Sequence, residues 1–399
     1  MPEQFGGTWH PAANPAGLTE LEVASGIVLG PGNGPRLALD ARVPPVQVLR
    51  DRACSLLAEH PCVVAFSGGR DSSALLAVLV DVARREGLDE PVAVTARWDD
   101  DEQSDESAWQ EQVIATIGVQ NWQIIRPGTD LDLLGAEATT ALEHQGLMWP
   151  APSYALLPMI RTASGGVFLT GEGGDEAFGL WPYGRLWSTV GKRKIPRQSD
   201  LRALLLGCAP RAARRRWWRH KLPPYQTWLR PGALARTAEL MADDQADDPL
   251  SWGHYQIVNG RRRSADLFLA TLSQLCASEG SNFVAPFLDT TFLAALGAWG
   301  GPLGKGDRTD VMTTLFSDVL PGPILSRTSK ATFGGVFWGP ASRAFAEAWD
   351  GTGLDSELID AEALRQAWMA PVPVYGSALP LHAAWLFDHQ RHREIPQGP

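Results

Sequence analysis

The chain has 399 residues, of which 44% are hydrophobic, and its formal net charge is −10. This length allows one large α/β domain or two smaller ones, and the acidic balance argues against a nucleic-acid substrate. Four cysteines without C-x-x-C spacing, a start without a secretion signal, and apolar runs shorter than the roughly 18 residues of a membrane span predict a cytoplasmic protein that does not enter a membrane.

Residues 1–47 are rich in Gly, Pro and Ala. Two apolar runs, at 22–29 and 36–41, flank the sequence GPGNGP, which is a strong turn signal. This pattern predicts a pair of strands. The segment is either a small lid or the remnant of a larger domain, and its composition does not separate the two.

Residues 48–180 alternate between strand-like and helix-like patterns, which indicates a parallel sheet. The expected strands are 63–66, 92–98, 122–127 and 167–170, and the expected helices include SALLAVLVDVARR, SAWQEQVIATIG, LLGAEATTALEH and SYALLPMIRTA. From about residue 185 onward the patterns are mostly helical. We therefore predict an α/β fold with a nucleotide-binding core at 48–184 and a mostly helical substrate region at 185–399.

The first chemically informative motif is VVAFSGGRDSS at 63–73. It places a strand, a glycine turn and a helix N-terminus in succession, so backbone N–H groups and the helix dipole converge on one anion. Asp71 adds a carboxylate where a magnesium ion bridging phosphates would bind. The motif differs from the other common phosphate loop, because no G-x-x-x-x-G-K-[ST] occurs in the chain.

A second glycine-rich turn occurs about a hundred residues later, in GGVFLTGEGGDEAFG at 165–179. Glu172, Asp175 and Glu176 follow its strand. Loops that follow parallel strands face one pocket at the edge of the sheet, so Asp71 and Asp175 become a candidate magnesium pair. Ordinary strand-to-helix turns also favour Gly and Asp, and this simpler interpretation stays open.

The segment 210–224, PRAARRRWWRHKLPP, is a basic exception in an acidic chain. A basic helix packed on the acidic remainder of the chain is one interpretation. Binding of an acidic peptide or protein is the other, because arginine mixed with tryptophan suits such partners.

Together the two glycine loops resemble the synthetase domain of the asparagine synthetase family, which includes β-lactam synthetases and lasso-peptide cyclases. SGGRDSS matches its pyrophosphatase loop, and TGEGGDEAFG is similar to its second loop. Weaker matches are Asp105, Glu106 and Ala108, VAPFLD at 284–289, and LSRTSKATFG at 325–334. The resemblance spans about 48–345 and implies the fold of an N-type ATP pyrophosphatase, also called adenine nucleotide alpha hydrolase-like.

The resemblance also implies roles for individual residues. Asp71 and Asp175 would hold Mg²⁺, Thr170 and Gly171 would lie beside the nucleoside, and the pyrophosphate would contact Ser67, Gly68, Gly69, Asp71, Ser72 and Ser73. Lys330 would stabilise the reacting phosphate or acyl centre, where a fixed ammonium counters the charge that develops. Arg327 would share the pyrophosphate by bidentate contact, and Glu172 is the third catalytic candidate.

Two departures from the family pattern change the expectation. Only about 47 residues precede the first predicted helix, Pro2 follows Met1, and the first cysteine is Cys54 in a helical stretch, so we expect no glutamine-hydrolysing domain. Asn282 and Val284 stand where the family has an acid and an arginine. Without that guanidinium, aspartate is a less suitable substrate.

These features predict an AMP-forming amide synthetase that uses ATP and Mg²⁺, with a role in specialised-metabolite or peptide tailoring. Its partners would be a small-molecule or peptide carboxylate and an amine, which is ammonia, a small amine or an internal amine. A separate amidotransferase or peptide-delivery protein stays open. The alternatives are a lasso-peptide or lactam cyclase and an inactive adaptor of the same fold; tRNA thiolation is disfavoured by the charge and the cysteine spacing.

Overall fold

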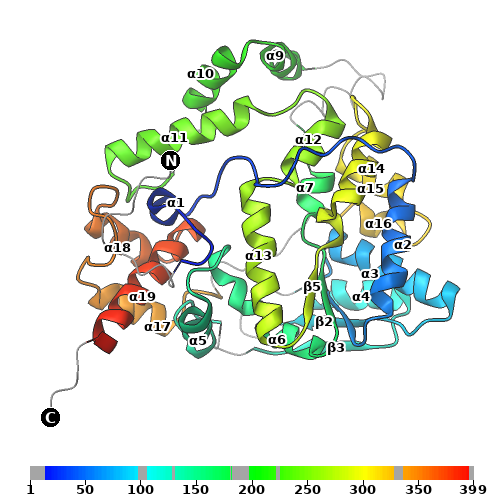
Figure 1. Ribbon diagram of the computed structural model, residues 1–399, viewed down its shortest axis with the longest axis horizontal. Coiled ribbons are helices and arrows are strands. Elements are labelled where there is room, and N and C mark those ends of the chain that lie inside the picture. Colours follow the sequence, from blue (N-terminus) through cyan, green and yellow to red (C-terminus); the bar gives the residue numbers. More distant parts are fainter. Residues whose placement is uncertain are drawn as a thin grey trace.

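The computed structural model describes residues 14–97, 106–127, 131–179, 181, 197–221, 225–327 and 336–394. Lys330 and Asp105 lie outside these residues. A five-stranded, fully parallel sheet forms the centre of the larger lobe, with helices on both faces (Figure 1). The strands are β1 (Cys62–Ala65), β2 (Val92–Ala96), β3 (Trp122–Ile125), β4 (Val167–Thr170) and β5 (Asn282–Val284). The α/β prediction and its four strands are confirmed, and β5 adds an edge strand that the sequence patterns did not indicate.

The strand order is β3-β2-β1-β4-β5, so the chain builds outward from β1 on one side and then returns to its other side. Ala65 of β1 pairs with Thr170 of β4. Ligands in such sheets bind beyond the carboxyl ends of the strands at the point where the order reverses. Here that point lies between β1 and β4, which are the strands that precede the two glycine loops.

Two hydrophobic cores cover the sheet, because neighbouring residues of a strand point to opposite faces. In β1, Val63 packs into one core and Val64 into the other, and both side chains are fully buried. The core around Val64 includes α2 (Pro45–Leu57), α3 (Arg70–Glu86), α4 (Ser107–Ile117), α7 (Gly174–Phe178), α12 (Trp252–Asn259), α14 (Thr290–Gly300), α15 (Arg308–Phe316) and α16 (Gly322–Leu325). The core around Val63 includes α5 (Ala136–Gln145), α6 (Leu157–Ile160) and α13 (Arg263–Ser278).

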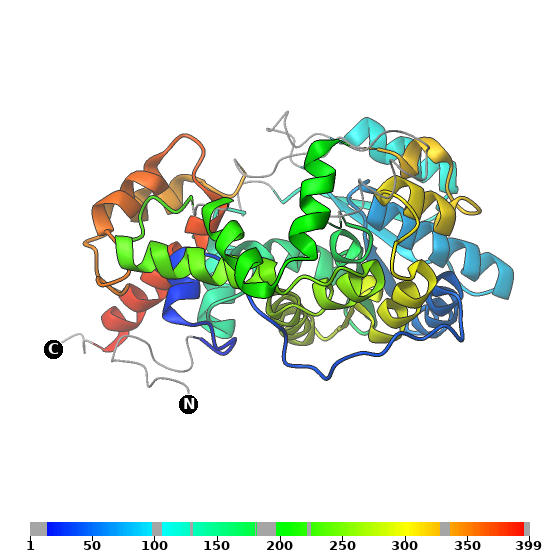
Figure 2. The ribbon, with the colours of Figure 1, turned by 90° about the horizontal axis from the view of Figure 1, so that it is seen from above.

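A second, helical lobe lies beside the sheet, as both ribbon views show (Figures 1 and 2). It contains α1 (Glu20–Ser25), α17 (Pro340–Ala348), α18 (Ala361–Met369) and α19 (Ala378–Glu394). The Val63 core continues into this lobe. The described part of 185–399 is thus helical apart from β5 and isolated bridges, in agreement with its sequence pattern.

The basic segment forms α10 (Arg211–Lys221), between α9 (Gln198–Gly207) and α11 (Pro231–Ala246). Arg211 and Arg215 of α10 each pair with Asp243 of α11, at 3.0 and 2.8 Å, and Arg211 also pairs with Asp247. The helix therefore packs on an acidic neighbour, as the first of the two interpretations expects. Binding of an acidic partner by α10 stays a prediction.

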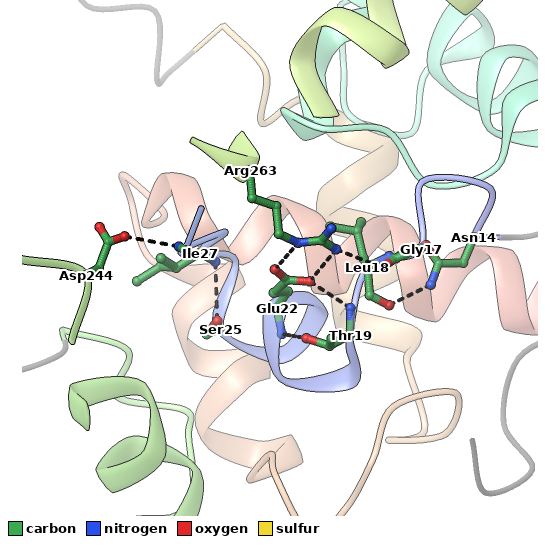
Figure 3. A network of polar contacts seen from close by, with 10 residues as sticks. Asn14, Gly17, Leu18, Thr19, Glu22, Ser25, Ile27, Asp244 and Arg263 are labelled. Carbon is green, nitrogen blue, oxygen red and sulfur yellow. Dashed lines mark hydrogen bonds and ion pairs between the residues drawn. The ribbon is translucent and has the colours of Figure 1, made fainter. Parts of the chain in front are cut away.

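The N-terminal segment differs from its prediction: within residues 14–47 the structure has the helix α1 and no strand pair. The Thr19 side chain accepts a hydrogen bond from the Glu22 N–H while the Glu22 carboxylate accepts one from the Thr19 N–H. This capping box and the left-handed Gly26 that ends the helix favour a helical turn over a strand. Arg263 of α13 pairs with Glu22 at 2.8 Å and fixes α1 on the body (Figure 3).

The helix expected over SYALLPMIRTA is also interrupted. The structure has a 3₁₀ helix at Ala151–Leu156, the single turn of α6, and another 3₁₀ turn at Arg161–Ala163. Pro152 and Pro158 account for this, because proline has no N–H to donate to a preceding turn.

Candidate active site

The first glycine loop connects β1 to α3 and presents the start of that helix. Gly68 has a φ of +83°, a left-handed conformation that favours glycine. The hydroxyls of Ser67 and Ser72 lie 3.1 Å apart across the turn, and Ser67 Oγ accepts a hydrogen bond from the Gly69 N–H at 3.2 Å. Gly69 precedes α3 without a side-chain cap. The other N–H groups of the first turn of α3 can therefore bind an anion beyond the end of β1.

The second loop, after β4, lies directly against the first. A Cβ atom on Gly174 would lie 2.3 Å from Cγ of Asp71, and one on Gly171 would lie 2.6 Å from the Ser72 nitrogen. Any side chain at these two positions would therefore separate the loops. The glycines allow the close approach that brings Asp71 and Asp175 to the same edge of the sheet.

One arginine joins the two aspartates. Arg308, the first residue of α15, donates from Nη2 to Asp71 Oδ2 at 2.6 Å and from Nη1 to Asp175 Oδ1. The Asp71 side chain is 21% exposed and that of Asp175 is 59% exposed. Sequence reasoning missed Arg308. The signal was an arginine in the first turn of a helix, where the helix dipole disfavours a cation.

Burial has the largest effect on the pKa values of the carboxyl groups at this edge of the sheet. It raises the pKa of Asp71, although Arg308 acts in the opposite direction, and it also raises the pKa of Glu176. Asp71 Oδ1, Ser73 Oγ and Thr170 Oγ1 are buried and have no hydrogen-bond partner within the described residues. Buried polar atoms are usually satisfied, so these three are available to a ligand at this edge.

The donor set fits magnesium and a nucleotide phosphate. Asp71 and Asp175 supply carboxylate oxygens, which Mg²⁺ prefers, while the start of α3 supplies N–H groups for phosphate oxygens. The unpartnered Asp71 Oδ1 and the close approach of Gly174 are the observations that support this fit.

Arg327 braces the first loop from the other side. Its guanidinium donates to the Gly68 carbonyl at 3.2 Å, pairs with Glu106 and lies 4.8 Å from the ring centre of Trp109. The Trp109 indole donates to the same carbonyl at 2.8 Å. The sequence suggested direct contact between Arg327 and pyrophosphate. The structure shows Arg327 holding the loop that would make such contacts.

Glu172 lies near the helical lobe. Partial burial of the Tyr375 hydroxyl, and then the nearby charge of Glu172, raise the pKa of Tyr375 to about 12. Tyr375 also lines a small hollow that is partly open to solvent, together with Leu133, Pro152, Phe337, Trp338, Pro373 and Ala378. Apart from Tyr375 these lining side chains are apolar, with only the indole N–H of Trp338 as a polar group. Glu172, a residue of the second glycine loop, is thus close enough for its charge to act on Tyr375, which lines this hollow.

Lys330 lies outside the described residues, so its role stays a prediction.

Val284, in β5, precedes the turn that carries Leu288. A Cβ atom on Gly173 would lie 2.4 Å from Leu288 Cγ, so the VAPFLD segment packs against the second loop.

Comparison with known proteins agrees with this geometry. The family model for asparagine synthase matches residues 50–386, which is most of the chain. No curated protein sequence matches it. Among the helices in the described residues, none has the length and apolar character needed to cross a membrane. The two glycine loops at the reversal of the strand order and the family match lead to one conclusion: the chain belongs to the asparagine synthase family of ATP-dependent carbon–nitrogen ligases that form amides.

Proposed function

We propose that this protein is an AMP-forming amide synthetase. A substrate carboxylate attacks the α-phosphorus of ATP and pyrophosphate leaves. An amine then attacks the acyl-adenylate, AMP leaves, and the amine loses a proton. The observation that carries the proposal is the contact between the two glycine loops, which places Asp71 and Asp175 on one guanidinium beside the N-terminus of α3.

The residues at this edge of the sheet would have different roles in the adenylation step. The start of α3 and the hydroxyls of Ser67, Ser72 and Ser73 would bind the phosphates, and Asp71 with Asp175 would hold Mg²⁺. When bound, the ion would neutralise charge on the phosphates and orient pyrophosphate as the leaving group. Arg327 would keep the first loop in place through the Gly68 carbonyl.

The acyl substrate would carry an apolar group. The hollow that Tyr375 lines has otherwise apolar walls, and the charge of Glu172 in the second loop acts on Tyr375. Val284 in the VAPFLD segment supplies no cation for a second carboxylate. These two features favour a carboxylate with an aliphatic or aromatic side group over aspartate.

The proposal is tested by ATP–pyrophosphate exchange with the full chain, MgATP and a panel of carboxylates. We expect exchange that depends on carboxylates with apolar side groups, and weaker exchange with aspartate. Release of ADP and phosphate in place of exchange would contradict the adenylation step. Product masses then identify the amine, since ring closure within one substrate lowers its mass by one water.

A matched pair of variants connects that assay to the site. Asp71→Asn and Asp81→Asn make the same change in the same helix, but Asp81 pairs with Arg50 and Arg85 away from the glycine loops. We expect exchange to be lost in the first and retained in the second. Equal exchange in both would refute the assignment of Asp71.

A further inference from the structure

Arg308 holds one oxygen of each of the two carboxylates that would bind a metal ion, Asp71 Oδ2 and Asp175 Oδ1, and leaves Asp71 Oδ1 without a partner among the described residues. Its two terminal nitrogens each hold one aspartate, Asp71 at 2.6 Å and Asp175 on the other side. The side chain is only 17% exposed, and its Nε is buried without a partner among the described residues. The guanidinium thus joins the two carboxylates as a divalent ion joins its ligands.

A cation bound between these carboxylates would face Arg308 at short range. Like charges a few ångströms apart in a partly buried site repel strongly, so Arg308 and a metal ion compete for the two carboxylates. Binding of Mg²⁺ to both aspartates therefore favours release of at least one of them by Arg308. A released guanidinium in a desolvated site needs a new anion, because an unpaired buried charge is costly.

The nucleotide supplies that anion in the proposed reaction. Arg70 stands at the start of α3 and donates to Thr309 at 3.3 Å, so Arg308 lies next to the helix start that would bind phosphate. Guanidinium groups bind phosphate by two parallel hydrogen bonds, as they bind carboxylates. The same guanidinium is therefore suited to pair with phosphate in place of one aspartate.

We propose that Arg308 is a positioning residue that exchanges partners: it holds Asp71 and Asp175 together in the nucleotide-free protein and transfers to the phosphates when MgATP binds. The proposal rests on the proposed function of this site. It implies that metal and nucleotide bind cooperatively. The phosphates draw Arg308 away from the metal ion, and the metal ion releases Arg308 to pair with the phosphates. The nucleotide-free protein should accordingly bind a divalent ion weakly.

Arg50 provides a matched control. It also joins two aspartates, Asp81 at 3.8 Å and Asp318, its side chain is 22% exposed, and its Nε likewise has no partner in the described part of the chain. It lies on α2, away from both glycine loops. Arg308→Met and Arg50→Met thus remove the same kind of bridge at two places, one of which is the candidate metal site.

The decisive measurement is Mn²⁺ binding to the full chain without nucleotide, followed by electron paramagnetic resonance. We expect Arg308→Met to bind Mn²⁺ at least about tenfold more tightly than the unchanged protein, within the usual range of coupling between sites, and Arg50→Met to leave the affinity unchanged. Adding Asp71→Asn to Arg308→Met should remove the gain. Equal Mn²⁺ affinity in the Arg308→Met variant and the unchanged protein would overturn the proposal.

A second measurement tests whether Arg308 transfers to the phosphates of ATP. With a chelator present, Arg308→Met should bind ATP several-fold more weakly, because the guanidinium no longer meets the phosphates. Unchanged binding of metal-free ATP would exclude the transfer to phosphate. If Arg308→Met does not fold, Arg308→Lys serves instead: an ammonium cannot hold both carboxylates in a fork, so Mn²⁺ should bind a few-fold more tightly, and an unchanged affinity would again count against the proposal.

The two proposals fail separately. If the unchanged protein catalyses ATP–pyrophosphate exchange but Arg308→Met gains no affinity for Mn²⁺, only the partner exchange is wrong. If Arg308→Met gains affinity for Mn²⁺ but no carboxylate supports exchange in the unchanged protein, competition at the aspartates stands and adenylation is wrong.

Discussion

Two aspartates have very different surroundings: the buried Asp132 in the helical lobe and the partly buried Asp71 at the edge of the sheet. Asp132 is 4% exposed, and its carboxylate accepts hydrogen bonds from the N–H groups of Leu134, Ala341 and Ser342 and from the Ser342 hydroxyl. Its carboxylate thereby caps the start of α17. Most of its partners are backbone N–H groups, which the fold holds in place. Asp71 has another side chain, that of Arg308, on one oxygen and no partner among the described residues on the other.

The difference shows how to separate structural from functional carboxylates. Asp132 is satisfied by fixed donors and by the positive end of a helix dipole, so its charge stabilises the fold. Asp71 is desolvated without full compensation, which lowers stability and leaves capacity for a ligand. Burial alone therefore does not identify a site; the identity of the partners does.

The largest expected effect tests the functional side of this comparison. Asp71→Asn should lower ATP–pyrophosphate exchange by about 100-fold or more, since it removes a charge that positions the metal and phosphates. Its free energy of unfolding should stay the same or rise, because burial disfavours the charged form of Asp71. Exchange assays and urea unfolding provide the two values. A large loss of stability would place Asp71 in the same class as Asp132.

The second-largest expected effect tests whether the charge of Asp132 stabilises the fold. Asp132→Ala should lower the free energy of unfolding by about 3 kcal/mol, because it leaves the buried N–H groups of Ala341 and Ser342 without an acceptor. Urea unfolding at neutral pH measures this change. Exchange per folded molecule should fall far less than in Asp71→Asn. If exchange fell as much as in that variant, the distinction between the two aspartates would not hold.

His382 gives a pH dependence to the helical lobe. It is fully buried and donates through Nε2 to the Leu133 carbonyl at 2.9 Å, and burial lowers its pKa to about 4. The unfolded chain therefore binds a proton more readily between about pH 6.5 and 4. Stability from His382 is present above that range and is lost as the pH falls, by up to about 3 kcal/mol at pH 4.

His382→Gln is the variant that isolates this contribution. A glutamine amide retains a donor for Leu133 and does not titrate. Unfolding measured from pH 7 to 4 should show a shallower loss of stability in the variant than in the unchanged protein. Identical slopes would mean that other groups cause the acid sensitivity.

The smallest expected effect concerns the α10–α11 surface, where arginine and aspartate also meet. Arg215 pairs with Asp243 at 2.8 Å, but each side chain is about one-third exposed. Such pairs are screened by water and salt, so Arg215→Ala should change the free energy of unfolding by less than about 1 kcal/mol. Urea unfolding in low and high salt checks this value. A larger effect would show that α10 depends on its pairs as α17 depends on Asp132.

Sequence patterns within short segments predicted the elements that such segments form by themselves. The four strands and both glycine loops follow from short apolar runs and from glycines beside Asp71 and Asp175. Arg308 was not predicted, because it lies 237 residues from Asp71 in the sequence and its partner is set by the fold. The same holds for Asp132 and α17, which are 210 residues apart at Ser342. α1 was mistaken for a strand because its capping box was overlooked.

The position of α1 has a consequence for the order in which parts of the chain fold. The carbonyls of Ala24 and Ser25 accept hydrogen bonds from the side chains of Trp228 and Gln226, and the backbone of Gly26 lies against that of Gly376. The first described helix is thus completed by residues 201 and 204 positions later in the sequence. Contacts of such high sequence separation slow folding, so we expect the packing of α1 to form late.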